Sequence, residues 1–282
     1  MEIKKIAVLG AEQMGSGIAL VAALAGFQVV IRDIKQEFCD RGMATIQKTL
    51  SKSVEKGKLT EEKAMEVLAS VSTTLAMEEL ADADLVIEAA PENLKLKHDM
   101  FVELGEICRE DAILATNTSS MSITDITGDT RCPQRCVGMH FFFPVRAMKL
   151  VEVIRSAFTS DETVAAVREV AEKMGKSPVE CRTDTPGFIV NRCLFAFMLE
   201  AIHCYEDGVA SIEDIDTAVK AGLNHPLGPF EMMDMSGLDT FPHVTETLES
   251  LPITTWTCPE SVKELIAEGR YGRKSGKGWY EY

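Results

Sequence analysis

The sequence predicts an α/β domain with a mostly parallel sheet, followed by an all-helical domain, with the boundary near Thr185. Before the boundary, short apolar runs of strand length alternate with segments of helical composition, as in a sheet with crossover helices. After it, the composition is mostly helical, and turn dipeptides such as Asp207-Gly208 separate the segments. Four helices are expected there, over 188–206, 212–221, 229–250 and 259–268. We therefore divide the chain into residues 1–185 and 186–282.

The beginning of the chain indicates what the first domain binds. Residues 6–9 form an apolar run typical of a buried strand, and Gly10 leads into an alanine-rich helical segment at 18–25. A second apolar run, 27–31, is followed by Asp33. Strand, glycine turn, helix, strand and acid within about 30 residues form the Rossmann-type βαβ unit, which binds a dinucleotide. The pyrophosphate lies on N–H groups at the helix N-terminus, and the acid accepts hydrogen bonds from the adenosine ribose.

One residue departs from the dinucleotide fingerprint Gly-x-Gly-x-x-Gly. Glu12 stands at the middle glycine, between Gly10 and Gly15. That glycine normally lets the backbone approach the pyrophosphate closely. The alternative is a strand–helix turn that needs glycine only for packing. The surrounding strands, the helix and the terminal acid favour the nucleotide site.

Composition and charge exclude several classes of partner. With 46% apolar and 26% charged residues, the chain has the composition of a globular protein. Its net charge of −15 disfavours nucleic acid and anionic membranes, because both would repel it. No apolar run approaches the ~18 residues that span a bilayer, and no secretory signal is visible. The eight cysteines form no Cys-x-x-Cys pair, so we expect reduced thiols, no metal site and a cytoplasmic location.

Polar side chains follow a second pair of predicted strands. A buried strand at 84–90 contains Glu88, and another, at 112–115, is followed by small hydroxyl and amide residues at 116–120. The carboxyl ends of parallel strands border the ligand crevice of an open α/β sheet. We therefore expect the 116–120 segment to contact a ligand. A helix N-cap is the competing explanation, and different residues of the segment can serve each role.

A histidine and an acid form the candidate catalytic pair. His140 lies near the end of an apolar strand, 136–141, and Glu152 lies within the alternating strand 150–154. An acid inside such a strand is costly unless it is paired, and the short connection allows the two side chains to meet. A carboxylate behind a histidine fixes its tautomer and stabilises the imidazolium. A purely structural pair is the alternative.

Three lysines recur every four residues in a helical segment, 35–58. Lys48, Lys52 and Lys56 would lie along one face of that helix. A solvated face is the simplest interpretation. In a chain this acidic, the same face is also where a phosphate-rich substrate could bind.

Taken together, the motifs resemble the short-chain L-3-hydroxyacyl-CoA dehydrogenases, and among them the bacterial enzymes that act on 3-hydroxybutyryl-CoA. The similarity extends over essentially the whole chain. The motifs are MGSGIA (14–19), IEAAPENLKLK (87–97), NTSS (117–120), HFFFP with MKLVEVI (140–154), TPGFIVNR (185–192), HPLGPFEMMD (225–234) and GRKSGKGWYEY (272–282).

The resemblance implies hydride transfer between NAD and carbon 3 of a short acyl-CoA, interconverting (3S)-3-hydroxybutyryl-CoA and acetoacetyl-CoA. It implies that His140 is the general acid/base, oriented by Glu152, and that Ser119 and Asn191 hold the substrate oxygen and reacting centre. The implied cofactor-binding residues are Gly10, Gln13, Met14, Gly15, Asp33, Glu92, Lys97, Ser119 and Lys274. The implied substrate-binding residues are Thr49, Lys52, Lys56, Ser119 and Asn191. The helical domain would bind substrate and form a homodimer or a higher homo-oligomer.

Two departures from the family leave alternatives open. Glu12 replaces a glycine, and Phe143 replaces the asparagine of the family's HFFNP. An impaired or non-catalytic dimeric relative with weak cofactor binding is therefore one alternative, and an enzyme acting on a small β-hydroxy acid without CoA is another. Asp33 favours NAD, because a carboxylate repels a 2′-phosphate, whereas Arg32 beside it could accommodate NADP.

Overall fold

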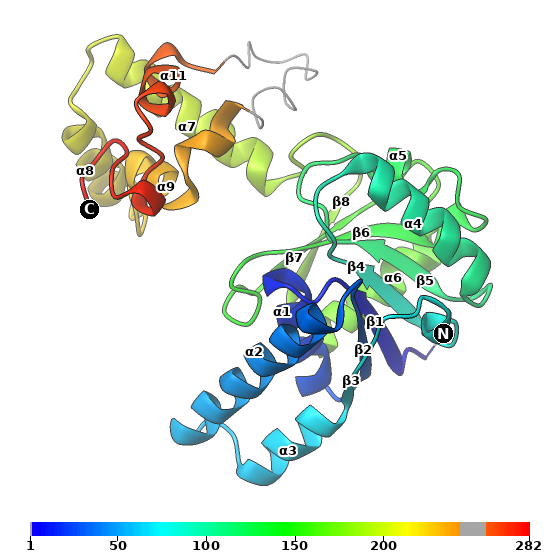
Figure 1. Ribbon diagram of the computed structural model, residues 1–282. Coiled ribbons are helices and arrows are strands. Elements are labelled where there is room, and N and C mark those ends of the chain that lie inside the picture. The colour runs from blue at the N-terminus through cyan, green and yellow to red at the C-terminus, as the bar shows by residue number, and fades with distance from the viewer. Residues whose placement is uncertain (1, 243–257) are drawn as a thin grey trace. The chain divides into compact units, whose positions relative to one another are not determined.

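A single sheet of eight strands organises the N-terminal part of the protein (Figure 1). Its order is β3-β2-β1-β4-β5-β6-β7-β8, and only the β6–β7 pair is antiparallel. The strands are β1 (Lys5–Leu9), β2 (Gln28–Arg32), β3 (Val71–Thr74), β4 (Leu85–Glu88), β5 (Ile113–Thr116), β6 (Cys136–Phe141), β7 (Leu150–Ile154) and β8 (Ser177–Cys181). The computed structural model describes residues 2–242 and 258–282. These form two compact units, which are divided between Thr185 and Pro186.

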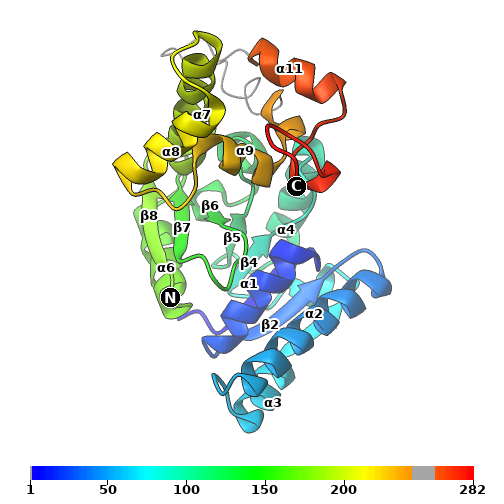
Figure 2. The same cartoon turned by 90° about the vertical axis from the view of Figure 1, so that its left-hand side faces the viewer.

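Helices cover both faces of the sheet, which explains why its strands are apolar on both sides (Figures 1 and 2). Within β1, Ile6 and Val8 pack into one hydrophobic core, whereas Ala7 and Leu9 pack into the other. The first core is covered by α1 (Gln13–Leu24), α2 (Gln36–Glu55), α3 (Glu61–Ala69) and α6 (Asp161–Lys173). The second is covered by α4 (Leu94–Ile107) and α5 (Ile123–Thr127).

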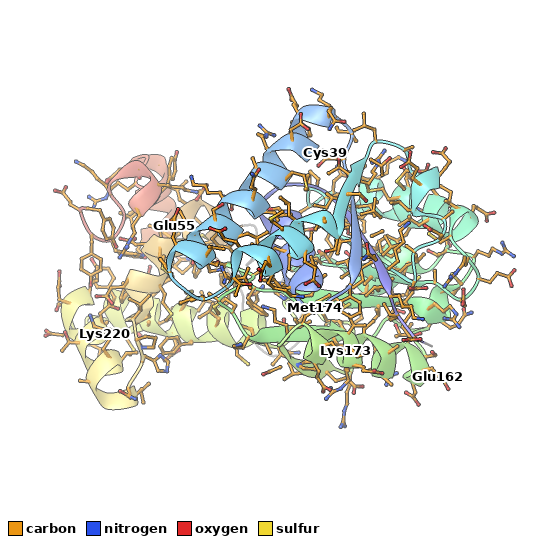
Figure 3. The ribbon with its side chains drawn as sticks, turned by 90° about the horizontal axis from the view of Figure 1, so that it is seen from below. Cys39, Glu55, Glu162, Lys173, Met174 and Lys220 are labelled. Carbon is orange, nitrogen blue, oxygen red and sulfur yellow. The ribbon has the colours of Figure 1, made fainter. Side chains whose placement is uncertain are left out.

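Helix α2 shows how an amphipathic sequence orients one of these helices. Cys39, Ile46 and Leu50 are buried on its inner side. Glu55, the last residue of α2, is exposed. Figure 3 labels Glu55 at this end of the helix and Cys39 near its start. The buried side chains attach α2 to the sheet, so the polar face is left to solvent or to a ligand.

The second unit is helical around a core that includes Ile202, Phe230 and Trp279. The rings of Phe230 and Trp279 meet edge to face, with their centroids 5.0 Å apart. Its helices are α7 (Val190–Glu206), α8 (Ile212–Leu223), α9 (Pro229–Ser236) and α11 (Glu260–Ala267). Short 3-10 turns complete the described chain at η1 (Glu78–Leu80), η2 (Pro133–Arg135), η3 (Leu238–Thr240) and η4 (Arg273–Ser275).

Two buried aspartates attach the C-terminal segment to the helices of this unit. Asp216 accepts hydrogen bonds from the backbone N–H of Phe230, at 2.9 Å, and from the Tyr280 hydroxyl, at 2.8 Å. Asp234 accepts hydrogen bonds from the backbone N–H of Trp279 (2.9 Å) and Tyr280 (3.1 Å), and from the Tyr282 hydroxyl (2.7 Å). These bonds stabilise the fold of residues 278–282.

The predicted fold class, an α/β domain of Rossmann type followed by a helical domain, is confirmed. Sequence analysis did not predict α3 and β3, which follow the lysine-bearing helix. The helix expected over 229–250 ends at Ser236, before Gly237, and residues 243–250 lie outside the described residues. Throughout residues 2–242 and 258–282, the helices are too short or too polar to cross a membrane.

Candidate active site

The carboxyl ends of five adjacent strands carry four of the residues predicted for the site, together with Glu88. The strands β2, β1, β4, β5 and β6 are neighbours in that order and are mutually parallel. Their ends carry Asp33, Gly10, Glu88, Ser119 and His140, respectively. The topology therefore collects, at one end of the strands, residues as far apart in sequence as Gly10 and His140, and this is where open α/β sheets bind ligands.

The turn between β1 and α1 depends on two of its glycines. Gly10 has a φ of +99°, and a Cβ there would lie 2.6 Å from the carbonyl oxygen of Ala89. A Cβ on Gly15 would lie 1.8 Å from the carbonyl oxygen of Gly10. Glu12 differs, because it has an ordinary φ of −74° and an exposed side chain at the N-cap of α1. The fold therefore requires glycine at 10 and 15 but accepts glutamate at 12.

The N-terminus of α1 fits the pyrophosphate of a dinucleotide. Gln13 and Met14 open this helix, and neither is buried. The Glu12 side chain makes no capping hydrogen bond to the first turn, so the backbone N–H groups of that turn are not occupied by it. The first turn of a helix carries N–H groups without intrahelical acceptors, and these groups attract phosphate.

Asp33 is fixed at the end of β2 by the neighbouring backbone. Its Oδ2 accepts a hydrogen bond from the N–H of Ala11 and its Oδ1 one from the N–H of Ile34, both at 2.7 Å. The Arg32 guanidinium donates from Nε to the carbonyl of Leu75, at 3.2 Å. The acid is therefore held beside the β1–α1 turn, as expected for a ribose acceptor.

His140 and Glu152 form the pair predicted from the sequence. They are directly opposite each other in the antiparallel β6–β7 ladder. The His140 Nδ1 lies 2.7 Å from the Glu152 Oε2, and the exposed fractions of the two side chains are 7% and 0%. Because a carboxylate only accepts hydrogen bonds, Nδ1 carries the proton and the neutral ring has Nε2 as its basic nitrogen. The Phe142 ring packs against the imidazole, with centroids 4.4 Å apart.

The segment after β5 is attached to the strand that carries His140. Asn117 accepts a hydrogen bond at its Oδ1 from the backbone N–H of Phe141, at 2.9 Å. Thr118 donates from its hydroxyl to the carboxylate of Glu92 at 3.0 Å, and the backbone N–H of Ser119 donates to the same carboxylate at 2.9 Å. Ser119 is therefore held at the edge where His140 lies.

Glu88 lies at the candidate site, and the sequence patterns did not predict a role for it. Its carboxylate is completely buried and lies 2.6 Å from the Lys97 Nζ, which is itself buried. The Lys97 ammonium also donates to the carbonyl of Ala90, at 3.0 Å, and lies 3.4 Å from Glu92. An acid that closes an otherwise apolar strand was the signal that could have identified it, because such an acid needs a partner. The cofactor-binding roles predicted for Glu92 and Lys97 stay predictions.

The loop between β6 and β7 contains Phe143, whose exposed fraction is 61%. Two hydrogen bonds hold this loop in place, because Lys176 donates to the carbonyl oxygens of Val145 and Met148. Burial lowers the pKa of the Lys176 ammonium from its ordinary value, and the charge of Lys149 lowers it further.

The substrate-binding residues predicted on α2 lie on its outer part. Lys48 and Lys52 are exposed, as is Lys56, which caps the end of the helix. Thr49 is half-buried and donates from its hydroxyl to the carbonyl of Thr45, at 2.8 Å. The lysine stripe, residues 48, 52 and 56, is therefore present as a basic surface.

Asn191 and Lys274 belong to the second unit, in α7 and η4. Lys274 forms an ion pair with Asp239. The first unit therefore brings together the predicted cofactor turn, Ser119 and the His140–Glu152 pair, whereas Asn191 and Lys274 belong to the other unit.

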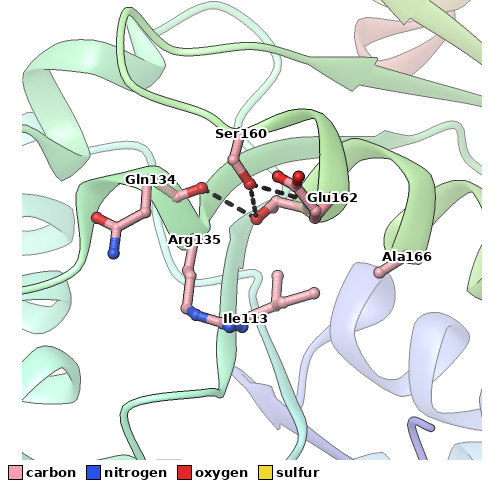
Figure 4. Close-up of a pocket in the computed structure, with 7 residues that line it drawn as sticks. Ile113, Gln134, Arg135, Ser160, Glu162 and Ala166 are labelled. Carbon is pink, nitrogen blue, oxygen red and sulfur yellow. Dashed lines mark hydrogen bonds between the residues drawn. The ribbon is translucent and has the colours of Figure 1, made fainter. Parts of the chain in front are cut away.

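A cavity of about 450 Å³ lies at the amino ends of the strands, whereas His140 lies near the carboxyl end of β6. Figure 4 shows the residues that line this cavity. Ile113 and Arg135 line it at the amino ends of β5 and β6, together with Ser160 at the start of α6. Ser160 caps α6 through the N–H of Thr163, so this polar group is used by the fold. The cavity contains none of the predicted site residues.

Two family models together match nearly the whole chain. Residues 5–185 match the 3-hydroxyacyl-CoA dehydrogenase NAD binding domain, and residues 187–282 match the 3-hydroxyacyl-CoA dehydrogenase C-terminal domain.

Individual relatives agree with these models over their full lengths. A probable 3-hydroxybutyryl-CoA dehydrogenase of Deinococcus radiodurans is 47% identical, with 99% of this chain and 100% of the relative covered. A 3-hydroxybutyryl-CoA dehydrogenase of Clostridioides difficile is 43% identical, with 99% of each chain covered. The crystal structure of an (S)-3-hydroxybutyryl-CoA dehydrogenase from Ralstonia eutropha is 40% identical and superposes with a TM-score of 0.96, covering 100% of this chain and 99% of the other.

Proposed function

Because this chain belongs to the 3-hydroxyacyl-CoA dehydrogenase family, we propose that it interconverts (3S)-3-hydroxybutyryl-CoA and acetoacetyl-CoA with NAD(H). The observation that carries the proposal is the His140–Glu152 pair, a buried imidazole 2.7 Å from a carboxylate at the ligand edge of the sheet. Removal of hydride from a carbinol carbon requires that the hydroxyl lose its proton, and this pair supplies a base for it.

His140 acts on the 3-oxygen of the substrate in both directions. In oxidation, its Nε2 accepts the proton of the 3-hydroxyl as the C–O bond becomes a carbonyl. The imidazolium that forms is stabilised by Glu152, which contacts the other ring nitrogen. In reduction, the same Nε2 returns the proton to the oxygen. Ser119, held by its N–H to Glu92, and Asn191 are proposed to hold the substrate oxygen and reacting centre.

The residues of the β1–α1 turn fit the dinucleotide, which supplies the hydride acceptor when it is bound. The first turn of α1 would hold the pyrophosphate, and Asp33 would accept from the adenosine ribose. We propose NAD over NADP, because the Arg32 guanidinium donates to the Leu75 carbonyl and the carboxylate of Asp33 repels a 2′-phosphate. Gln13, Met14, Glu92, Lys97 and Lys274 complete the proposed cofactor site.

The lysine stripe supports CoA as the carrier of the substrate. The exposed ammonium groups of Lys52 and Lys56, with Thr49 beside them, would contact the CoA phosphates. The chain has a net charge of −15 and would repel a polyanion as a whole, so a local group of lysines is needed to attract one. A cytoplasmic location and a homodimer or higher homo-oligomer, formed through residues 186–282, complete the proposal.

Initial rates of NADH oxidation with acetoacetyl-CoA test this function. We expect turnover with acetoacetyl-CoA, far lower rates with acetoacetate, and a preference for NADH over NADPH. Turnover of acetoacetate alone would favour an enzyme of small β-hydroxy acids. Absence of both turnover and NADH binding would favour the non-catalytic relative that Glu12 and Phe143 suggest. Light scattering on the protein as it elutes from a size-exclusion column measures its molar mass and therefore the number of chains in the assembly.

A further inference from the structure

A buried ion pair is connected by direct contacts to the segment that carries Ser119. It joins Glu88, the last residue of β4, to Lys97 in α4, with the Nζ and Oε1 atoms 2.6 Å apart. The side chains of Glu88 and Lys97 are 0% and 1% exposed, respectively. We call these two residues the buried pair. Placing two charges out of water is costly, so a buried pair is weak evidence of stabilisation and calls for another reason.

The remaining polar atoms of the buried pair bind the ends of two strands. Glu88 accepts from the N–H of Ala90 at 2.6 Å and, through Oε2, from the hydroxyl of Thr116 at 2.7 Å. The N–H of Asn117 donates to the backbone carbonyl of Glu88, also at 2.7 Å. Lys97 donates to the carbonyl of Ala90. The buried pair therefore fixes the carboxyl ends of β4 and β5 relative to each other.

A second carboxylate connects the buried pair to Ser119. The Lys97 Nζ lies 3.4 Å from Glu92, whose side chain is 43% exposed. Glu92 accepts hydrogen bonds from the backbone N–H of Ser119, at 2.9 Å, and from its hydroxyl, at 3.4 Å. The Thr118 hydroxyl donates to both oxygens of this carboxylate, at 3.0 Å. The contacts form a continuous path from Glu88 through Lys97 and Glu92 to Ser119.

We propose that Glu88 and Lys97, apart from any contact of Lys97 with the cofactor, act as positioning residues: through Glu92 they set the place of Ser119 relative to the reacting oxygen. The inference rests on the proposed function, in which Ser119 contacts the substrate. Lys97 would supply the positive charge that keeps the Glu92 carboxylate turned toward residues 118 and 119, and Glu88 would keep Lys97 in place. A small displacement of Ser119 would then affect the reaction although neither buried residue contacts the substrate.

The test removes both charges together, because loss of Lys97 alone would leave the Glu88 carboxylate buried without its counter-ion. In Glu88→Gln/Lys97→Met we expect kcat with acetoacetyl-CoA to fall about 10-fold or more, within the up to ~100-fold that small misplacements cost. In a Ser119→Ala background the same pair of substitutions should lower kcat by less than about 2-fold, because residues that act as a unit are not additive. The control is Lys95→Met/Asp99→Asn, which removes an exposed ion pair from the same helix.

Hydrogen exchange supplies a readout that does not require activity. The Ser119 amide is bonded to Glu92, so exchange in a peptide spanning residues 117–122 should become faster in Glu88→Gln/Lys97→Met and remain unchanged in the control. Unchanged exchange in this peptide, or an equal loss of kcat with and without the Ser119 hydroxyl, would overturn the inference. If the unsubstituted chain does not turn over acetoacetyl-CoA, the proposed function fails. Faster exchange would then still support the path to Ser119, and unchanged exchange would refute it.

Discussion

Both units bury carboxylates, but the groups that contact those carboxylates differ in kind. In the first unit, Glu152 is completely buried and its partner is the titratable ring of His140. In the second unit, Asp234 is 1% exposed, and its partners are two backbone N–H groups and the Tyr282 hydroxyl. The first arrangement holds a group that can exchange a proton with a ligand. The second fixes the path of the chain. Burial alone therefore does not identify a functional acid, whereas the chemistry of its partner does.

The largest effect should come from His140, which is the partner in the first unit. His140→Ala should lower kcat about 10²–10⁴-fold, the usual contribution of a general acid/base. Because this change removes the imidazole that contacts Glu152, His140→Gln provides a matched variant that keeps an amide donor and should lose as much activity. Steady-state rates with acetoacetyl-CoA and NADH measure both. Unchanged turnover in His140→Ala together with loss of turnover in Glu152→Gln would reverse the assignment.

Substitution of Asp234, the structural acid of the second unit, should change the stability of the protein and leave its kcat nearly unchanged. Asp234→Asn should lower the free energy of unfolding by about 1–3 kcal/mol, because an amide replaces the buried carboxylate that accepts from two backbone N–H groups and the Tyr282 hydroxyl. Urea unfolding measures the change, and kcat per folded molecule should hardly move. A kcat that falls as far as in His140→Ala, at unchanged stability, would contradict the distinction between the two units.

Glu152, the acid proposed to orient His140, should have an intermediate effect. Glu152→Gln keeps the imidazole but removes the charge that stabilises the imidazolium, and should lower kcat about 10- to 100-fold, as for other partners that orient a histidine. The loss should therefore be smaller than in His140→Ala. An effect confined to unfolding, with normal rates, would place Glu152 with Asp234 among the structural acids.

An exposed carboxylate provides a third case for the same comparison. Glu12 is exposed at the N-cap of α1, so its repulsion of a pyrophosphate acts through water and amounts to about 1 kcal/mol, or about 5-fold in affinity. Calorimetry should show tighter NADH binding by Glu12→Gly, a separate gain in Phe143→Asn, and both gains in the double variant. Unchanged or weaker binding by Glu12→Gly would show that the glutamate does not oppose the cofactor.

The smallest effect should appear at alkaline pH, through the tyrosines of the second unit. Burial, followed by the hydrogen bond to Asp234, raises the pKa of Tyr282 from 10.0 to about 12. Burial and Asp216 raise the pKa of Tyr280 as well. A folded-state pKa above the unfolded value stabilises the protein below pH 10, and this stabilisation is lost as the pH rises through 12.

The urea midpoint should therefore fall between pH 10 and 12, and less steeply in Tyr280→Phe/Tyr282→Phe than in the unsubstituted chain. Lysines titrate in the same range, so the difference between the two proteins is the quantity to compare. Equal slopes would show that the tyrosine–aspartate bonds do not contribute.

Local sequence patterns were sufficient where one segment determines its own structure. The apolar run at 136–141 is β6 with the same bounds, and the alternation at 150–154 is β7. Pairing of His140 with Glu152 followed because an acid in a buried strand needs a partner. The strand β3 was missed because Val71–Thr74 is short and largely polar, and becomes a strand by pairing with β2.

Long-range contacts were outside the reach of pattern reasoning. Glu88 and Thr116 are joined by a hydrogen bond that depends on β4 and β5 being neighbours, which no local pattern specifies. Likewise, nothing in the sequence indicated that Lys97 would be buried. A charged residue near a ligand-binding motif is expected at the surface, and its burial follows from the tertiary position of α4.

The turn between β1 and α1 has a consequence for directed evolution. Suppose that residues 10, 12 and 15 are randomised and the library is sorted twice, once for solubility and once for retention on an immobilised dinucleotide. Steric overlap with the carbonyls of Ala89 and Gly10 should eliminate side chains at 10 and 15 in the first sort. Position 12, with its ordinary backbone angle and exposed side chain, should emerge from that sort nearly random. Only the second sort should restrict position 12. The residues found at positions 10, 12 and 15 would therefore reflect two separate requirements, folding at 10 and 15 and dinucleotide binding at 12.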